Sequence, residues 1–426
     1  MIACASVSLR QLAQGRWSAQ MRFWRFLANQ RVTVDKLIEG WSEQTPPAVA
    51  GRHVLAIQDT SEIKFTTTAE NRRGLGKIKK GNAFGLLLHP LLAVDADSGS
   101  VLGLAGGRVW TRRDEAKTPH AQRRLTDKES ARWIAVAEQG KETLAGARLI
   151  TIVDDREGDF YAHWALTPAE NVHLLTRLMN DHALVEGGTV RTALAQLPVA
   201  ATAAVALPQR RDRRARTAHL SLRFASLRLQ RPKNTLEKDL PDSLAVRVVE
   251  VIEGHPPKDA EPVHWILLTT HAIDSVADAW QIVAWYKRRW IIEQFFRTLK
   301  RQGLRIEDSQ LATADRLLKL VAIAAKAAAI VMQLVQARDG RDPQPASLAF
   351  TQNEVAAIAI LNARLQGKTH RQKNPHPTHS LAWAAWVIAK LGGWHEYEAK
   401  PPGPITFHNG LAYFRVFAEG WAAKNV

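Results

Sequence analysis

The chain has 426 residues, and its 58 lysines and arginines outnumber its 41 aspartates and glutamates to give a formal net charge of +17. With 46% hydrophobic and 23% charged residues, the composition excludes a disordered basic tail and a fibrous repeat. The length allows two or three folded units. An excess of positive charge on a folded chain predicts a polyanionic partner, with nucleic acid ahead of an anionic membrane surface.

The cysteine content and the N-terminal residues indicate the cellular compartment of the protein. Cys4 is the only cysteine, which excludes an internal disulfide and a multi-cysteine zinc site and favours a reducing compartment. Residues 1–10 show neither a long apolar core nor a small-residue cleavage pattern, so we expect a cytoplasmic protein. The most apolar window, 317–335, contains Lys319 and Lys326, and we interpret it as a buried core helix rather than a membrane span.

The first half of the chain predicts an α/β sheet, since apolar runs bounded by turn signals alternate with segments of helical spacing. The runs that we interpret as strands are 53–58, 84–96, 101–109, 148–153 and 172–178. The helical segments are 14–42, 130–140 and 160–166. Thr126 and Glu129 form a capping-box pattern ahead of the second of these helices.

The pattern of the second half changes twice. Between 185 and 270 the period becomes two, with strand-like runs separated by loops rich in Pro, Gly and Arg, and we predict an all-β insertion. Its expected strands are 203–207, 218–229, 244–252 and 263–268. Helical spacing returns from 274 to about 338, and a second helical block at 380–391 ends at a Gly-Gly pair.

Acidic residues end two of the predicted strands. Asp59 follows the first strand-like run, and by itself it reads as a turn residue, because Asp is favoured in turns. The charged stretch 154–159 follows the run 148–153 and opens with Asp154 and Asp155. Carboxylates that two neighbouring strands present at one edge of a sheet are suited to hold Mg²⁺, which prefers oxygen ligands.

A third candidate lies on the helix predicted after 274. Tyr286, Arg289, Glu293 and Lys300 are spaced so that, at about 100° per residue, all four fall within an arc of about 60°. By itself, such a stripe is equally compatible with the solvated face of a helix rich in Lys and Arg. The combination with the two acidic strand ends is more informative than any of the three alone.

Together these motifs resemble the IS4-family DDE transposases. The family's Tyr-x-x-Arg-x-x-x-Glu-x-x-x-x-x-x-Lys signature is similar to the stretch WYKRRWIIEQFFRTLK, which contains Tyr286, Arg289, Glu293 and Lys300. The family's second acid lies in an Asp-Arg-Glu-x-Asp motif, here 155–159, and its first acid precedes a Thr, as Asp59 does. The resemblance covers about residues 50 to 394.

The resemblance implies an α/β fold, with an RNase H-like catalytic core interrupted by the all-β insertion and flanked by helical N-terminal and C-terminal regions. Its expected parts are a helical N-terminal region at 1–48 that is a shortened DNA-end-binding part, the core at 49–184 and 271–340, the insertion at 185–270, and a helical dimerisation region at 341–426.

The resemblance also implies a metal site. Asp59, Asp155 and Glu293 would be the catalytic acids and would bind two divalent ions, Mg²⁺ with Mn²⁺ as a substitute. From the residues alone, Asp154 competes with Asp155, because neighbours on a strand point to opposite faces. The position of the motif favours Asp155.

The implied activity is that of a DNA transposase, which moves an insertion sequence by phosphodiester hydrolysis, hairpin formation and strand transfer. Trp265 would stack on a flipped base, although a Trp inside a strand-like run is more often a core residue. Tyr286, Arg289 and Arg177 would grip the neighbouring phosphate, and Lys300 would approach the DNA backbone. Further basic residues are expected to widen this surface. They are Lys77, Lys79, Lys80, Arg210, Arg211, Arg213, Arg214 and Arg216.

The implied partners are double-stranded DNA, both transposon ends and target, and a second copy of the chain on that DNA. No membrane and no small-molecule cofactor is expected, and the implied location is the bacterial cytoplasm at the nucleoid. Relatives carry an additional N-terminal segment that recognises the ends. An N-terminally shortened, non-catalytic inhibitor that binds DNA or full-length transposase is therefore the alternative function, and an RNase H-like nuclease without strand transfer is a third.

Overall fold

The computed structural model shows a mixed α/β fold built on one large sheet. It describes residues 6–66, 72–78, 83–112, 118–119, 122–207, 209, 214–258, 261–300, 304–341, 343–395 and 401–424. The strands are β1 (His53–Gln58), β2 (Ser61–Lys64), β3 (Gly76–Lys77), β4 (Phe84–Asp95), β5 (Val101–Trp110), β6 (Leu149–Val153), β7 (Val172–Arg177), β8 (Ala201–Leu207), β9 (Arg216–Gln230), β10 (Ser243–Glu253) and β11 (His264–Thr269).

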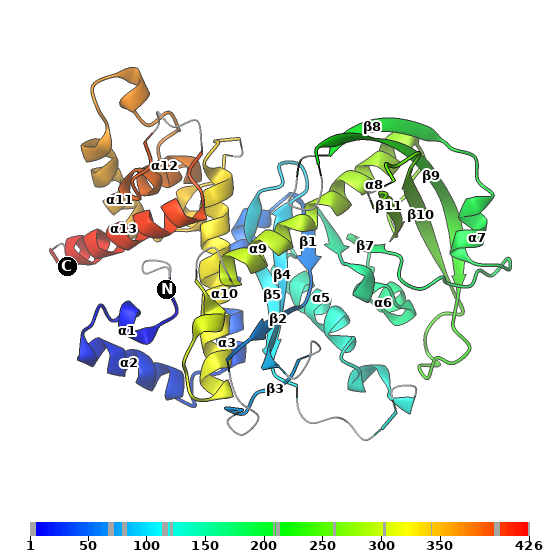
Figure 1. The fold of residues 1–426 in the computed structure, drawn as a ribbon, viewed down its shortest axis with the longest axis horizontal. Coiled ribbons are helices and arrows are strands. Elements are labelled where there is room, and N and C mark those ends of the chain that lie inside the picture. Colours follow the sequence, from blue (N-terminus) through cyan, green and yellow to red (C-terminus); the bar gives the residue numbers. More distant parts are fainter. Residues whose placement is uncertain are drawn as a thin grey trace.

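Helices surround this sheet and form the two ends of the chain (Figure 1). The first six are α1 (Leu9–Leu12), α2 (Trp17–Ala28), α3 (Val34–Glu39), α4 (Thr45–Val49), α5 (Ala131–Thr143) and α6 (Tyr161–Leu166). The others are α7 (Val190–Ala195), α8 (Val276–Arg288), α9 (Trp290–Lys300), α10 (Ala314–Ala337), α11 (Gln352–Leu365), α12 (Leu381–Leu391) and α13 (Pro404–Lys424).

The sheet has eleven strands in the order β2-β4-β1-β6-β7-β11-β10-β9-β8, with β3 and β5 also paired to β4. The β1–β6 and β6–β7 pairs are parallel, whereas β4 runs antiparallel to β1 and β5. The segment predicted as an all-β insertion extends this same sheet, because β11 pairs with β7. That segment is not all strand, since a capping box at Thr189 starts the short helix α7.

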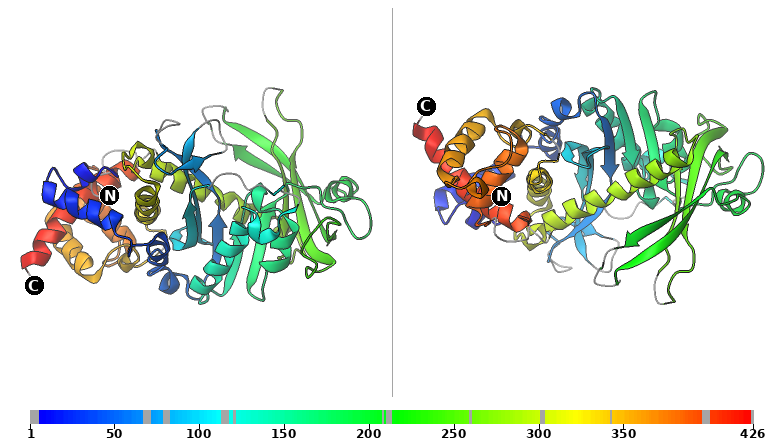
Figure 2. Two further views of the ribbon diagram at one scale, coloured as in Figure 1. Left: turned by 90° about the horizontal axis from the view of Figure 1, so that it is seen from below. Right: turned by 90° about the horizontal axis from the view of Figure 1, so that it is seen from above.

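The sheet carries a separate layer of helices on each face (Figure 2). Ile57 of β1 packs in one apolar cluster with Ile292 and Phe295 of α9 and with much of α10. Ala56, the next residue back, belongs to a second cluster with Val136 of α5 and with part of α6. The alternation of side chains along each strand therefore decides which helices a residue faces.

The helix α10 packs as a core helix between the sheet and the terminal helices (Figure 1). It is 24 residues long, and its most apolar 18-residue window has a mean hydropathy of 1.9, enough to cross a membrane by length and composition, but 72% of that window is buried. Lys319 donates to the carbonyl oxygens of Leu27 and Asn29, and Lys326 donates to that of Trp41. The buried Lys319 and the half-buried Lys326 thus attach the N-terminal helices to α10.

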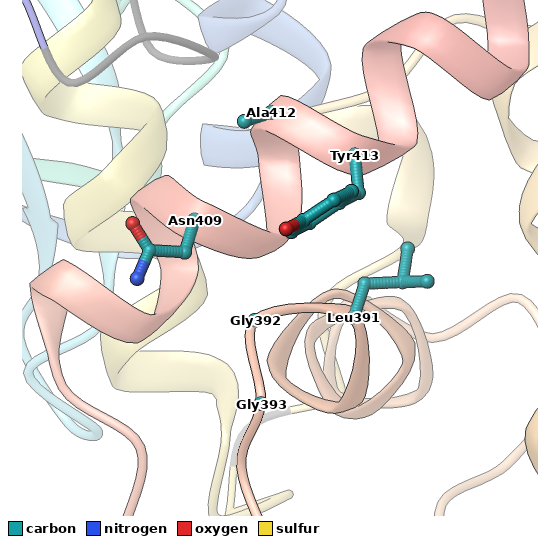
Figure 3. A pocket seen from close by; sticks show the side chains of 6 residues that line it. All are labelled: Leu391, Gly392, Gly393, Asn409, Ala412 and Tyr413. Carbon is teal, nitrogen blue, oxygen red and sulfur yellow. The ribbon is translucent and has the colours of Figure 1, made fainter.

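The C-terminal helices α12 and α13 cross at close range. At the crossing, a Cβ on Gly410 would lie 1.7 Å from the carbonyl oxygen of Ile388, so only glycine fits. As predicted, α12 ends at Gly392 and Gly393, and the second of these has a φ of +83°. A pocket lies between the end of α12 and α13 (Figure 3). It is lined by Leu391, Gly392, Gly393, Asn409, Ala412 and Tyr413.

The capping box predicted at Thr126 and Glu129 is wrong. The N-cap residue of α5 is Ser130, and no side chain caps this helix. The carboxylate of Glu129 instead accepts hydrogen bonds from the guanidinium of Arg112, at 3.1 Å from Nη2. An ion pair with a residue outside the helix has thus replaced the local bond that the sequence pattern suggested.

Candidate active site

Asp59 lies at a gap between two strands that share one register. Both β1 and β2 pair with β4. Gln58 of β1 lies opposite Leu91, and Ser61 of β2 lies opposite Leu88, so the register is the same on both sides of Asp59. This register leaves Asp59 opposite Pro90, which has no N–H group to donate to a neighbouring strand. The side chain of Asp59 lies on the same face of the sheet as that of Ile57, toward α9.

The parallel register places a second acid beside the first. Ile57 pairs with Val153 of β6, so that the residues two positions further on are Asp59 and Asp155. Asp155 follows Val153 onto the α9 face, whereas Asp154 points to the α6 face. There Asp154 is fully buried and lies 2.7 Å from Nε2 of His163. The structure therefore brings Asp155, and not Asp154, to Asp59.

Arg289 lies at a joint between two helices. The single helix predicted over this region is in fact two, because α8 ends at Arg288 and α9 begins at Trp290. The N–H of Arg289 donates to the carbonyl oxygen of Tyr286, and Arg289 in turn accepts from the N–H of Ile292. Both bonds span three residues instead of four, which tightens the backbone at this point.

The guanidinium of Arg289 stands between two of the predicted acids. Its Nη1 lies 3.1 Å from Oδ2 of Asp59 and 3.7 Å from Oε1 of Glu293. Burial raises the pKa of Asp59 to about 8, helped by the negative charges of Asp155 and Glu293 and opposed by Arg289. Burial also raises the pKa of Asp155. The acids are therefore crowded together, with one permanent cation among them.

The three acids fit a divalent cation by their chemistry. They offer carboxylate oxygens, which hard cations prefer, and a bound cation would relieve the repulsion that raises the pKa of Asp59. Within the described ranges, no three His, Cys, Asp or Glu side chains are already gathered closely enough to hold a metal ion. The position beside Asp59 and Glu293 is instead taken by the guanidinium of Arg289.

Residues 52–330 match a family described as the transposase DDE domain. This chain belongs to the DDE transposase domain family. A similar solved structure is the piggyBac transposase in a synaptic complex with hairpin DNA, at 11% sequence identity and a TM-score of 0.35. The similarity covers 75% of this chain and 55% of that one, so the chain spans about half the length of that protein.

In this transposase domain, the residues predicted to hold DNA lie beside the acids on the same face of the sheet. Arg177 ends β7, and its Nη2 donates to the carbonyl oxygen of His264 at 2.8 Å. The ring of the half-buried Trp265 meets that of Tyr286 edge-on, with centroids 5.4 Å apart. Burial raises the pKa of Tyr286 to about 12, so its hydroxyl is a neutral donor at physiological pH.

The remaining basic residues of the prediction are only partly described. Lys300 turns toward β2 of the transposase domain, where its Nζ donates to the carbonyl oxygen of Glu62. Arg216 forms an ion pair with Glu253 on the neighbouring strand. Five of the predicted basic residues lie outside the described residues of the chain. They are Lys79, Lys80, Arg210, Arg211 and Arg213.

Sequence reasoning missed Arg132 of α5, which is only 6% exposed and bonded to the turns that follow β1 and β6. A signal was present in the sequence. Arg132 stands next to Trp133, on the part of the predicted helix that carries its apolar face, where an arginine must find buried partners.

Proposed function

We propose that this chain is a Tn5-like DNA transposase of the IS4 family, which cuts an insertion sequence out of DNA and joins it to a target. The observation that carries the proposal is the convergence of Asp59, Asp155 and Glu293 about one arginine, in a chain of the DDE transposase domain family. The strand order β5-β4-β1-β6-β7, three antiparallel strands followed by two parallel ones, supports an RNase H-like core.

Asp59, Asp155 and Glu293 would hold the divalent cations, Mg²⁺ with Mn²⁺ as a substitute. When bound, such a pair of ions stabilises the attacking and leaving oxygens of an in-line phosphoryl transfer. The backbone already orients two of the carboxylates. Asp59 accepts a hydrogen bond from the N–H of Thr60, and Asp155 accepts one from the N–H of Glu157, both at 2.7 Å.

Arg289, Arg177 and Tyr286 would bind the phosphate next to the cleaved bond. Arg offers two parallel donors that match a phosphate, and the Tyr286 hydroxyl adds a neutral one. Trp265, at the edge of this group, would stack on the base that hairpin formation forces out of the duplex. The net charge of +17 supports a long DNA footprint. A second copy would join through the C-terminal helices, and the cell compartment would be the bacterial cytoplasm.

The test uses DNA that carries the inverted repeats flanking the coding sequence. The purified chain, incubated with this DNA and Mg²⁺, should give nicks, hairpins and joined products that resolve on denaturing gels. Asp155→Asn and Glu293→Gln should each lower the cleavage rate by about 10³-fold or more, because each removes a ligand charge and leaves shape unchanged.

The matched control is Asp97→Asn, an exposed acid in the turn between β4 and β5 at the other end of the sheet. This variant should cut DNA at the wild-type rate. Tight DNA binding without any cleavage by the wild-type chain would contradict the enzyme and favour the non-catalytic inhibitor. Normal cleavage by Asp155→Asn or Glu293→Gln would show that the metal ligands are wrongly assigned.

A further inference from the structure

A buried arginine lies directly behind the two acidic turns. Arg132 is on the first turn of α5, on the face of the sheet opposite Asp59 and Arg289. Its guanidinium lies 5.4 Å from the ring centroid of Trp133 and 6.0 Å from that of Trp110. A charge that is 94% withdrawn from water is retained only where hydrogen bonds and opposite charges compensate it.

The hydrogen bonds of Arg132 connect the two turns that carry the acids. Its Nε donates to Oγ1 of Thr60 at 2.9 Å, and its Nη2 donates to Oε2 of Glu157 at 2.8 Å. Nη1 donates to the carbonyl oxygen of Glu129, which fixes the guanidinium to its own helix. One rigid, planar group therefore spans the turn after β1 and the turn after β6.

The two residues that Arg132 binds also orient the two carboxylates. The backbone N–H of Thr60 donates to Oδ1 of Asp59, and the backbone N–H of Glu157 donates to Oδ1 of Asp155. In each turn the same residue thus holds an acid through its main chain and Arg132 through its side chain. A shift of the guanidinium would move both carboxylates.

A directed chain of hydrogen bonds fixes the Thr60 hydroxyl. Its oxygen accepts from Arg132, and its proton is donated to Nδ1 of His89, at 2.7 Å, because the other ring nitrogen faces an oxygen that can only accept. Nε2–H of His89 then donates to Oε1 of Gln58, at 3.0 Å. The amide of Gln58 donates in turn to the carbonyl oxygen of Trp133. Burial keeps the pKa of His89 well below its usual value, which matches the neutral ring that this order requires.

We propose that Arg132 is a positioning residue that sets the separation and orientation of Asp59 and Asp155 for cation binding, without touching DNA or metal. The inference rests on the proposed function, because it concerns the same two acids. Residues that orient metal ligands typically change metal affinity or activity by about 10- to 100-fold when they are altered. Arg132 acts on two of the proposed ligands at once, through Thr60 and Glu157.

The first test compares Arg132→Gln with the wild-type full chain. Mn²⁺ binding, followed by loss of the free-ion signal in electron paramagnetic resonance, should weaken by about 10- to 100-fold. The Mn²⁺ concentration for half-maximal DNA cleavage should rise by the same factor, and high Mn²⁺ should restore part of the rate. Affinity for end-bearing DNA should stay within about twofold, since Arg132 lies behind the sheet. A merely structural loss would reduce the active fraction without changing the Mn²⁺ requirement.

The matched control is Arg52→Gln. Arg52 precedes β1 at its other end and pairs with Asp95 at 2.8 Å, so the same change is made far from the acids. This variant should bind Mn²⁺ as the wild type does. If Arg132→Gln does not fold, the pair Thr60→Val and Thr60→Ser replaces it. The valine variant loses the hydroxyl and should weaken Mn²⁺ binding, whereas the serine variant keeps it and should not.

Wild-type Mn²⁺ affinity in Arg132→Gln, or in Thr60→Val, would overturn the proposal. A wild-type chain that cuts no DNA would contradict the proposed function instead. Crystal structures of the wild type and Arg132→Gln then decide the positioning role by themselves. Displaced Asp59 and Asp155 carboxylates in the variant support it, and unmoved carboxylates overturn it.

Discussion

The parallel strands β1, β6 and β7 carry a buried polar cluster at each end. At the ends where the strands finish, the acids lie around Arg289, and burial together with the charges of Asp155 and Glu293 raises the pKa of Asp59. At the ends where they begin, the hydroxyl of Thr151 lies 2.8 Å from Nε2 of His53 and 2.7 Å from that of His271. The ring of His173 stacks on His271, with centroids 3.9 Å apart.

The two clusters differ in whether charged groups are held close together. Burial lowers the pKa of His53 to about 4 and that of His271 to about 3, so both rings are neutral, and each forms a hydrogen bond with the hydroxyl of Thr151. Like charges at the acidic end are instead held close, which costs stability and is typical of sites that bind or react. We therefore expect the histidine cluster to stabilise the fold and the acidic cluster to serve the proposed chemistry.

The largest expected effect is that of a substitution at the acidic end, which should abolish DNA cleavage without lowering stability. Asp59→Asn should lower the rate of DNA cleavage by about 10³-fold or more, because it removes one of the proposed metal ligands. The melting temperature should stay the same or rise, since burial and the charges of Asp155 and Glu293 already disfavour an ionised carboxylate at this position. Nicking assays and thermal unfolding in metal-free buffer measure both. A large fall in melting temperature would mean that the acidic end stabilises the fold after all.

A second substitution at the same end should affect hairpin formation but not the first nick. Trp265→Ala should reduce hairpin formation by about 10-fold, because base stacking contributes about 1–3 kcal/mol, and it should spare the first nick. Quantifying both products on one denaturing gel tests this, with Trp265→Phe as the variant that keeps a stacking face. Equal hairpin yields in all three chains would assign Trp265 to the core beside Tyr286.

At the histidine end, Thr151→Val should lower stability without affecting cleavage. The change leaves nitrogens of His53 and His271 without their partner, which costs about 1–3 kcal/mol for each buried group. An unfolding entropy of about 2.1 cal/mol/K per residue gives roughly 1 °C per kcal/mol for a chain of 426 residues, so the melting temperature should fall by a few degrees. Thr151→Ser, which keeps the hydroxyl, should melt close to the wild type. A loss of cleavage with unchanged melting would reverse the roles of the two ends.

The histidine end also predicts a pH dependence of stability. The native pKa values of His53 and His271 lie below the unfolded value of 6.5, so the unfolded chain binds more protons between about pH 3 and 6.5. The free energy of unfolding should therefore be highest above pH 6.5 and fall as the pH drops toward 4. Besides burial, Arg148 and His173 oppose protonation of His53, whereas Asp97 and Asp95 favour it. Protonation of His271 is opposed by burial, His173 and His53.

Urea unfolding at several pH values measures this slope. The raised pKa of Asp59 gives the opposite slope, so the measurement is cleanest in the Asp59→Asn background. Replacing both His53 and His271 with Gln should flatten the acid-side fall, and His370→Gln, in the C-terminal region, should not. An unchanged slope in the double variant would show that other groups govern the acid sensitivity.

Much of the acidic end was predictable because strands alternate with a period of two. The apolar runs located β1 and β6 within one residue, and their ends located Asp59 and Asp155. What the runs could not provide was the register between strands, which decides that Asp155 lies beside Asp59 while Asp154 bonds to His163. That choice depends on pairing between distant segments.

The rest of the site depends on contacts that leave weak local signals. The joint at Arg289 is invisible to a helical pattern, because both helices continue the same periodicity across it. Arg132 finds its partners 72 and 25 residues away along the chain, in Thr60 and Glu157. The six-residue helix α7 is too short for its spacing to stand out within a segment of strands.

The pairing of β1 with β6 also has a consequence for folding kinetics. Ile57 and Val153 are about 100 residues apart in sequence, so their contact closes a long loop that also contains β4, β5 and α5. Contacts of this separation form slowly, and local hairpins such as β4–β5 close first. We expect pulse-labelling hydrogen exchange to show β4 and β5 protected before β6, so that the two acids meet only late in folding.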